Sequence, residues 1–173
     1  MTAPAEDTRK NGKNPARILL VEDSTDDVLL IEEALRQTCA ESDVRIVGDG
    51  EAAMDFLHRR GRYVDEPRPD IVLLDLNLPK KGGMEVLAEL RNDPRFCALP
   101  VIVLTTSYAE RDIARAYDKQ ANAYLTKPID VDDFIRVVRS IEDFYLHTAR
   151  LPGAEPSRSA GSPAGSATAE LTG

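Results

Sequence analysis

Four short hydrophobic runs in this sequence each lead into polar or charged side chains that could act together on a phosphoryl group. The runs are followed by two adjacent acids, an aspartate, a threonine and a lysine, namely Glu22 with Asp23, Asp75, Thr105 and Lys127. Carboxylate oxygens bind Mg²⁺, an aspartate can attack phosphorus, and an ammonium or a hydroxyl can bind phosphoryl oxygens. The set therefore predicts Mg²⁺-dependent transfer of a phosphoryl group to Asp75.

The hydrophobic runs are short and rich in Val, Ile and Leu, which is typical of strands buried on both faces of a parallel sheet. They alternate with amphipathic helices, five times in all, between residues 16 and 147. We predict an α/β fold with a doubly wound, five-stranded parallel sheet of the flavodoxin-like order 2-1-3-4-5 and helices on both faces. In this order the first and third strands are neighbours, which places Glu22 and Asp23 beside Asp75.

Three of the helices are expected to begin at a polar residue that is followed three residues later by an acid, as in a capping box. These pairs are Ser24 with Asp27, Ser107 with Glu110, and Asp130 with Asp133. The last helix runs to about residue 147 and carries two apolar stripes, Phe134, Val137, Ile141 and Phe144 on one and Ile135, Val138 and Tyr145 on the other. Either both stripes pack on the same core, or the second forms a symmetric dimer interface. We favour the dimer.

Composition limits the classes of function. The 173 residues carry a net charge of -8, which argues against binding of nucleic acid or of an anionic membrane surface. No apolar run approaches the roughly 18 residues of a membrane-spanning helix, and the polar start of the chain lacks a secretory signal. Two cysteines, Cys39 and Cys97, are too few for a disulfide framework. We expect a cytoplasmic protein.

The two ends of the chain differ from its middle in composition. Residues 1–15 are polar and are predicted to be a flexible N-terminal segment, and residues 16–150 form one folded domain. Residues 151–173 are rich in Ser, Ala, Gly and Pro and have too few large apolar side chains to bury. We predict that this C-terminal tail is disordered and of low complexity.

Several pieces of the sequence, as an ordered set, resemble the receiver domain of two-component response regulators. They are residues 18–23, 70–79, 82–83, 104–105 and 124–128, and the resemblance covers roughly residues 16–147. It implies that Asp75 accepts a phosphoryl group from a sensor histidine kinase. It also implies a Mg²⁺ site made by Glu22, Asp23, Asp75 and the backbone carbonyl of Asn77, with Asp23 a direct ligand and Glu22 bound through water.

The resemblance also assigns a conformational switch. Thr105 and Tyr124 resemble the switch pair of the family, and Lys127 resembles its phosphate-binding lysine, with a cis peptide bond to Pro128. The phosphoryl group would draw in the Thr105 hydroxyl, and the Tyr124 ring would fill the vacated space. The face made by the fourth and fifth helices and the last strand would then change shape.

A narrower likeness concerns the single-domain regulators that partner bacterial and cyanobacterial phytochromes, which are light-sensing histidine kinases. It is carried by residues 75–81, 104–107, 122–124 and 134–144. Two features depart from that subgroup: Tyr145 stands where a tryptophan is expected, and the chain has a long low-complexity tail. The likeness implies a stand-alone response regulator, a signalling protein rather than an enzyme, downstream of a phytochrome-like kinase.

Three other functions compete with this interpretation. A phosphatase of the haloacid dehalogenase type would need a second aspartate two residues after Asp75, where this chain has Asn77, an amide that cannot serve as a general acid. A receiver-like module that is never phosphorylated usually lacks the acid pair, the aspartate or the lysine, and all are present here. A flavin-binding protein would need a phosphate-cradling loop of Gly, Ser and Thr after the first strand, and no such loop follows that strand in this sequence.

Overall fold

The computed structural model of the protein describes residues 15–37 and 42–152. Most of the predicted flexible segment 1–15 and of the predicted disordered tail 151–173 lies outside these residues, as does Cys39. Those predictions, and the domain boundaries that depend on them, therefore stay predictions. Cys97 lies within the described residues and carries an exposed free thiol.

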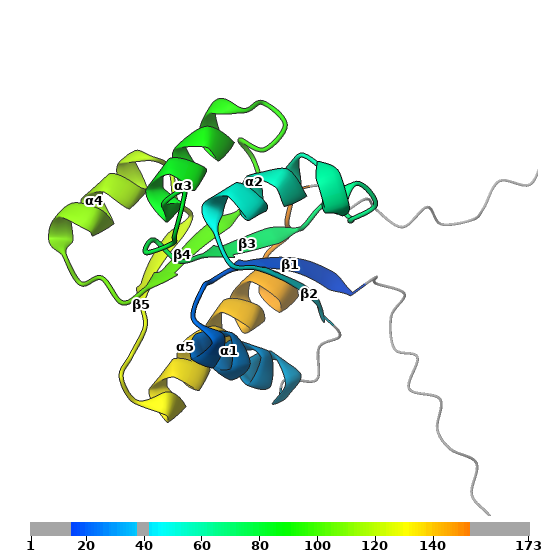
Figure 1. Ribbon diagram of the computed structural model, residues 1–173. Coiled ribbons are helices and arrows are strands. Elements are labelled where there is room, and N and C mark those ends of the chain that lie inside the picture. The colour runs from blue at the N-terminus through cyan, green and yellow to red at the C-terminus, as the bar shows by residue number, and fades with distance from the viewer. Residues whose placement is uncertain (1–14, 38–41, 153–173) are drawn as a thin grey trace, which may run out of the picture. The chain divides into compact units, whose positions relative to one another are not determined.

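Five strands form one parallel sheet, which confirms the predicted α/β fold (Figure 1). The strands are β1 (Ala16–Val21), β2 (Ser42–Val47), β3 (Ile71–Leu74), β4 (Val101–Thr105) and β5 (Ala123–Thr126). Their order is β2-β1-β3-β4-β5, as predicted. Val21 of β1 pairs with Leu74 of β3. The residues that directly follow these two therefore leave adjacent strands at the same edge of the sheet.

Helices cover both faces of the sheet, with α1 and α5 on one face and α2, α3 and α4 on the other (Figure 1). Their bounds are α1 Thr25–Gln37, α2 Gly50–Leu57, α3 Gly83–Asn92, α4 Glu110–Asp118 and α5 Val131–Glu142, with a short 3-10 turn at Gly61–Tyr63 and a π-helical turn at Asp143–Thr148. Alternate residues of β1 face opposite sides of the sheet, as strand geometry requires. Leu19 and Val21 join the core beneath α2 and α3, and Ile18 and Leu20 join the core beneath α1 and α5.

Burial differs among the strands: the inner strand β1 is buried only from Ile18 onward, and neither edge strand, β2 or β5, is buried throughout. Every residue of β3 and β4 is buried, but all four residues of β5 are only half-buried. This is the pattern expected of inner and outer strands in a sheet covered on both faces. Among the described residues, no helix is long and apolar enough to cross a membrane.

Two of the three predicted helix starts are confirmed, and one is wrong. The Ser24 hydroxyl accepts a hydrogen bond from the Asp27 N–H at 3.3 Å, and the Asp130 carboxylate accepts one from the Asp133 N–H at 3.1 Å. By contrast, α4 begins at Glu110 and not at the residue after Ser107. The Ser107 hydroxyl accepts from the Ala109 N–H at 3.4 Å and donates to the Asp112 carboxylate at 2.6 Å, and the N-cap position of α4 is Ala109.

The buried face of α5 differs from both predicted stripes. Phe134, Val138 and Ile141 are buried together, because their spacing of four and three residues puts them on one face of the helix. The predicted dimer stripe is therefore wrong, because Val138 is buried and Ile135 and Tyr145 pack against the same core. Phe144 falls in the π-helical turn and is 55% exposed, so it does not belong to the core.

Candidate functional site

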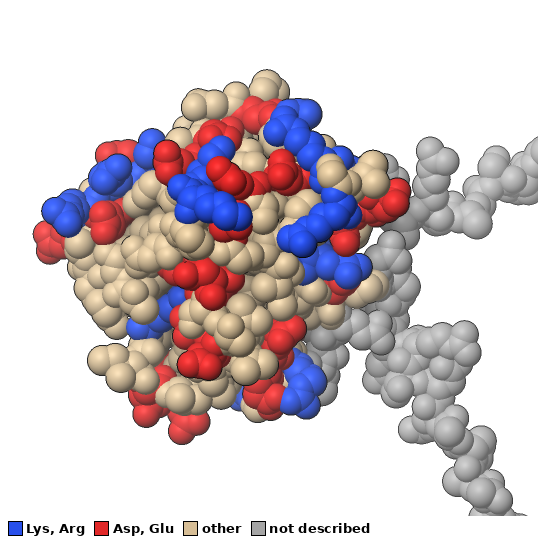
Figure 2. All heavy atoms as spheres, in the orientation of Figure 1, with Lys and Arg blue, Asp and Glu red and all other residues tan. Residues whose placement is uncertain are grey.

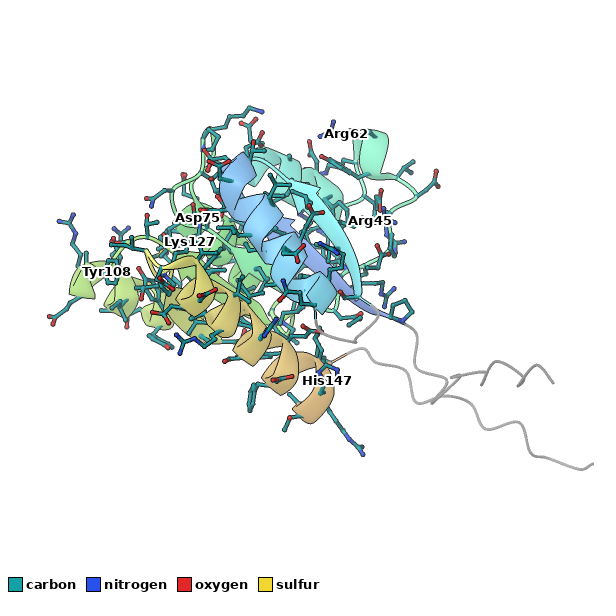
Figure 3. The ribbon with its side chains drawn as sticks, turned by 90° about the horizontal axis from the view of Figure 1, so that it is seen from below. Arg45, Arg62, Asp75, Tyr108, Lys127 and His147 are labelled. Carbon is teal, nitrogen blue, oxygen red and sulfur yellow. The ribbon has the colours of Figure 1, made fainter. Side chains whose placement is uncertain are left out.

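The ends of β1, β3, β4 and β5 bring most of the predicted site residues into one buried cluster. Glu22, Asp75, Thr105 and Lys127 are each at most 6% exposed although all are polar or charged. The Lys127 Nζ lies 3.7 Å from the Asp75 Oδ2. Figure 3 shows these two side chains next to each other at the end of the sheet. Buried charges are costly unless they are paired, so the cluster holds compensating groups.

Three carboxylates of this cluster could hold a metal ion. Glu22, Asp23 and Asp75 each offer an oxygen, and these oxygens lie within 4.8 Å of one another. Mg²⁺ prefers oxygen ligands and keeps several waters, and Asp23 is exposed to solvent, so the donor set fits this ion. The fourth predicted ligand is the backbone carbonyl of Asn77, two residues after Asp75, and its role stays a prediction.

A close approach of the backbone fixes the loop that follows Asp75. A Cβ atom on Gly83 would lie 2.1 Å from the Asp75 carbonyl oxygen, so only glycine allows α3 to begin there. A Cβ atom on Gly50 would lie 2.1 Å from the Lys81 carbonyl oxygen, at the start of α2. The loop between β3 and α3 is therefore held at both sides, and with it Asn77.

The Lys127 ammonium is surrounded by carboxylates. Its Nζ lies 2.5 Å from the Glu22 Oε2 and 2.7 Å from the Asp27 Oδ2. Burial alone would lower the pKa of Lys127, but the hydrogen bonds to Asp27 and Glu22 and the charge of Asp75 outweigh burial and raise that pKa. The lysine is therefore held in its charged form beside Asp75.

Sequence reasoning missed Asp27 as a residue of this site, since it assigned Asp27 only to the start of α1. The Asp27 carboxylate belongs to the first turn of that helix and reaches Lys127, which is 100 residues away in the sequence. A possible signal was the run of acids after β1, because the first turn of a helix that follows a strand faces the same edge of the sheet as the strand end.

The predicted switch residues are linked through the loop between β4 and α4. The buried Thr105 hydroxyl accepts hydrogen bonds from the Asn77 amide at 3.4 Å and from the Ser107 N–H at 3.5 Å. The Tyr124 hydroxyl donates to the Ser107 carbonyl at 2.9 Å. Tyr108, which sequence reasoning also missed, donates its hydroxyl to the Lys127 carbonyl at 3.1 Å. This loop thus connects both predicted switch residues with Lys127.

The expected cis bond between Lys127 and Pro128 is wrong, because no peptide bond among the described residues is cis. The trans form is the more stable one for most bonds that precede proline.

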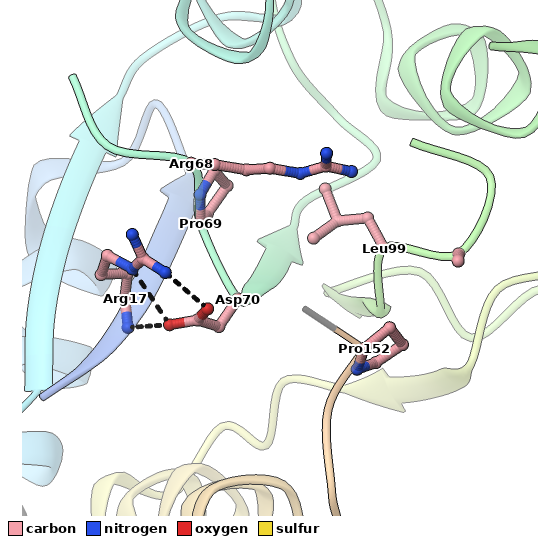
Figure 4. Close-up of a pocket in the computed structure, with 7 residues that line it drawn as sticks. Arg17, Arg68, Pro69, Asp70, Leu99 and Pro152 are labelled. Carbon is pink, nitrogen blue, oxygen red and sulfur yellow. Dashed lines mark hydrogen bonds and ion pairs between the residues drawn. The ribbon is translucent and has the colours of Figure 1, made fainter. Parts of the chain in front are cut away.

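A pocket of about 370 Å³ lies at the opposite end of the strands from these acids, and Figure 4 shows the residues that line it. Arg17, near the start of β1, forms an ion pair there with Asp70, which precedes β3, with 3.0 Å between Nη2 and Oδ1. The Arg17 backbone N–H also donates to the Asp70 Oδ2 at 2.9 Å. Leu99, before β4, and Pro152 also line it. The acidic cluster and the pocket are therefore separate features of the domain.

Comparison with known proteins decides the family. A family model of the response regulator receiver domain matches residues 18–139, most of the chain. The chain belongs to this family. The order and direction of its strands agree with the receiver fold of its structural neighbours.

Relatives of this receiver include phytochrome and red light response regulators. The chain is 47% identical over 140 residues to the response regulator Rcp1 of Synechocystis, a match that covers 81% of this chain and 95% of Rcp1. The structure of Rcp1 with bound Mn²⁺ matches with a TM-score of 0.77 over 80% of this chain and 99% of Rcp1. The phosphorylated cyanobacterial phytochrome response regulator RcpA matches with a TM-score of 0.78 and 46% identity, over 80% and 99% of the two chains. RPA3017, from red light signalling in R. palustris, matches with a TM-score of 0.74 and 38% identity, over 79% and 98%.

Proposed function

We propose that this protein is a stand-alone response regulator that accepts a phosphoryl group from a histidine kinase on Asp75 in a Mg²⁺-dependent reaction. The observation that carries the proposal is the position of Asp75, a buried carboxylate that lies both within the acidic cluster and 3.7 Å from a buried ammonium. Groups of both signs around one carboxylate suit a phosphoryl group, since its transfer needs a positioned nucleophile and compensation of negative charge.

Each residue of the site has a distinct role in this proposal. An Asp75 oxygen attacks the phosphorus of the phosphohistidine, the P–N bond breaks, and its electron pair goes to the imidazole nitrogen. Mg²⁺ would be held by the Glu22, Asp23, Asp75 and Asn77 ligand set, and it would neutralise charge on the phosphoryl oxygens. Lys127 contributes a second positive charge, and the Thr105 hydroxyl donates a hydrogen bond. The phosphoryl group stays on Asp75, so the protein acts as a signalling partner and not as an enzyme.

Removal of the metal is expected to abolish the reaction. Wild-type protein incubated with Mg²⁺ and an acyl phosphate should gain one labile adduct of about 80 Da in intact mass. The same incubation with excess EDTA should give none, because the unneutralised carboxylates repel the incoming phosphoryl group. An adduct of equal yield in EDTA would contradict the proposed role of the metal, and absence of any adduct would contradict phosphorylation itself.

We also propose that the signal leaves through the surface formed by α4, β5 and α5. The Tyr124 hydroxyl holds the Ser107 carbonyl, and the Thr105 hydroxyl accepts from the Ser107 N–H, so movement of either residue moves this loop. Tyr124→Ala should accept the phosphoryl group at the wild-type rate but show at least about a three-fold smaller response of the α4 and α5 amide signals in NMR spectra. Loss of phosphorylation in this variant would contradict the separation of chemistry from switching.

A second copy of this chain is the partner that we propose for the last helix region. Phe144 is 55% exposed and packs edge-on against Tyr145, with ring centroids 5.0 Å apart. Phe144 is thus an exposed aromatic ring supported by the half-buried Tyr145, and this supports a symmetric contact at one end of the helix. Sedimentation should show a dimer at high concentration for the wild type and less of it for Phe144→Ser. A wild type that stays monomeric, with and without a phosphate mimic, would contradict this proposal.

A phytochrome-like light sensor is the kinase that we propose. Two of the solved structures that resemble this chain are the phytochrome response regulator RcpA and RPA3017, from red light signalling. We propose neither nucleic acid nor a membrane as a partner. The net charge of -8 supports this, and on the face that Figure 2 shows, basic and acidic side chains are interspersed and not gathered into a basic patch.

A further inference from the structure

Lys127 has one carboxylate partner that is not shared with the acidic cluster. Its Nζ lies within hydrogen-bond distance of Glu22 and Asp27, at 2.5 and 2.7 Å, but 3.7 Å from Asp75. Glu22 belongs to the group of oxygens that could hold a metal ion, whereas Asp27 does not. Asp27 is therefore the partner that Lys127 keeps when Glu22 is drawn toward a cation.

The local structure of α1 holds Asp27 in place for this contact. The Asp27 N–H donates to the Ser24 hydroxyl, which fixes the first turn of the helix. The Asp27 carboxylate is 27% exposed, and the Lys127 side chain is 5% exposed. The neighbouring Asp26 is exposed, and it makes no ion pair within the part of the chain that the structure describes. One of two adjacent acids thus faces the site, and the other faces solvent.

Loss of Asp27 would change what the ammonium contacts. A buried ammonium that loses a partner cannot regain it from water at 5% exposure, and an unpaired buried charge is costly. Without Asp27, the Lys127 ammonium keeps Glu22 at 2.5 Å only until a cation draws that carboxylate away. The next carboxylate oxygen is then the Asp75 Oδ2 at 3.7 Å, about 0.5 Å beyond hydrogen-bond distance. The lysine would therefore move onto Asp75, occupy one of its oxygens and repel a metal ion bound there.

We infer that Asp27 is a positioning residue, which holds the Lys127 ammonium short of Asp75 and so leaves the Asp75 oxygens available to the metal ion and the phosphorus atom. This inference rests on the proposed function. It adds a residue of α1 to the site, and it explains why Lys127 can lie beside the phosphate acceptor without neutralising it.

The test compares Asp27→Ala with Asp26→Ala, a matched control that removes one negative charge from the adjacent position. Calorimetric titration with Mg²⁺ alone and the rate of adduct formation with an acyl phosphate are measured for both variants. In Asp27→Ala we expect the Mg²⁺ affinity and the phosphorylation rate each to fall about five-fold or more, whereas Asp26→Ala changes either by less than about two-fold. Asp27→Asn, which keeps the shape of the side chain, serves if the alanine variant does not fold.

A background that lacks the lysine separates positioning from a general effect of charge. In Lys127→Ala, the further change Asp27→Ala should leave the Mg²⁺ affinity unchanged within about two-fold, because no ammonium remains to be held. The inference is overturned if Asp27→Ala binds Mg²⁺ as the wild type does, if Asp26→Ala loses as much affinity, or if the loss persists without Lys127. Failure of the wild type to be phosphorylated would contradict the proposed function instead, and the Mg²⁺ titration would still decide the role of Asp27.

Discussion

Asp75→Asn is expected to abolish phosphorylation and to leave the fold intact. An amide oxygen is far less nucleophilic than a carboxylate oxygen, so no acyl phosphate should form. The asparagine has the same shape, and its oxygen can still accept the hydrogen bond from the Leu76 N–H, which is 2.7 Å long in the wild type. One charge fewer in a crowded acidic cluster relieves repulsion, so the free energy of unfolding should change by less than about 1 kcal/mol.

Intact mass after incubation with Mg²⁺ and an acyl phosphate tests this expectation. The wild type should gain one adduct, and Asp75→Asn none. Asp70→Asn is a suitable control, because Asp70 lies at the other end of the strands in an ion pair with Arg17, so its loss affects stability and not the site. An adduct on Asp75→Asn at the wild-type level would place the phosphoryl group on another residue.

The strands were predictable because their cause is local, and the crossover rules of doubly wound sheets then favour the observed order. Runs such as residues 71–74 and 101–104 are apolar on both faces, and their spacing leaves room for one helix between strands. Once the order is known, the chemistry follows from adjacency. Val21 pairs with Leu74, so the acids after Val21 must lie beside the one after Leu74.

The parts that could not be predicted depend on contacts between distant residues. Asp27 was predicted to act only within its own helix, and nothing near it in the sequence indicates that Lys127 reaches it. Ser107 was predicted to cap a helix, but Asp112 captures its hydroxyl. In both cases a polar side chain had two available partners, and the tertiary structure determined which one it contacts.

Arg91, in α3, carries the second large expected effect, this time on stability. Its guanidinium donates hydrogen bonds to the Gln120 carbonyl at 2.9 Å, to the Leu99 carbonyl at 2.9 Å and to the Asn122 side-chain oxygen at 3.0 Å. It also makes longer contacts with the carbonyls of Phe96 and Cys97. One side chain thus joins the loop before β4 to the loop before β5.

Arg91→Ala should lower the free energy of unfolding by about 3 kcal/mol, because five acceptors, two of them in part-buried bonds, lose a charged donor together. The free energy of unfolding of Arg91→Lys should lie between those of the wild type and Arg91→Ala, since a single ammonium cannot match the planar fork of the guanidinium. Arg136→Ala is the matched control. Its side chain is 73% exposed and, among the described residues, pairs with the nearby Asp133, so its removal should cost less than about 0.5 kcal/mol.

Urea denaturation monitored by circular dichroism measures the free energy of unfolding of all three variants. These loops lie at the end of the sheet opposite Asp75, so Arg91→Ala should still be phosphorylated at the wild-type rate at temperatures where it is folded. A loss of stability no larger than that of Arg136→Ala would show that water replaces the guanidinium at its acceptors. A slower phosphorylation of the folded variant would instead show that the two ends of the sheet are coupled through β4 and β5.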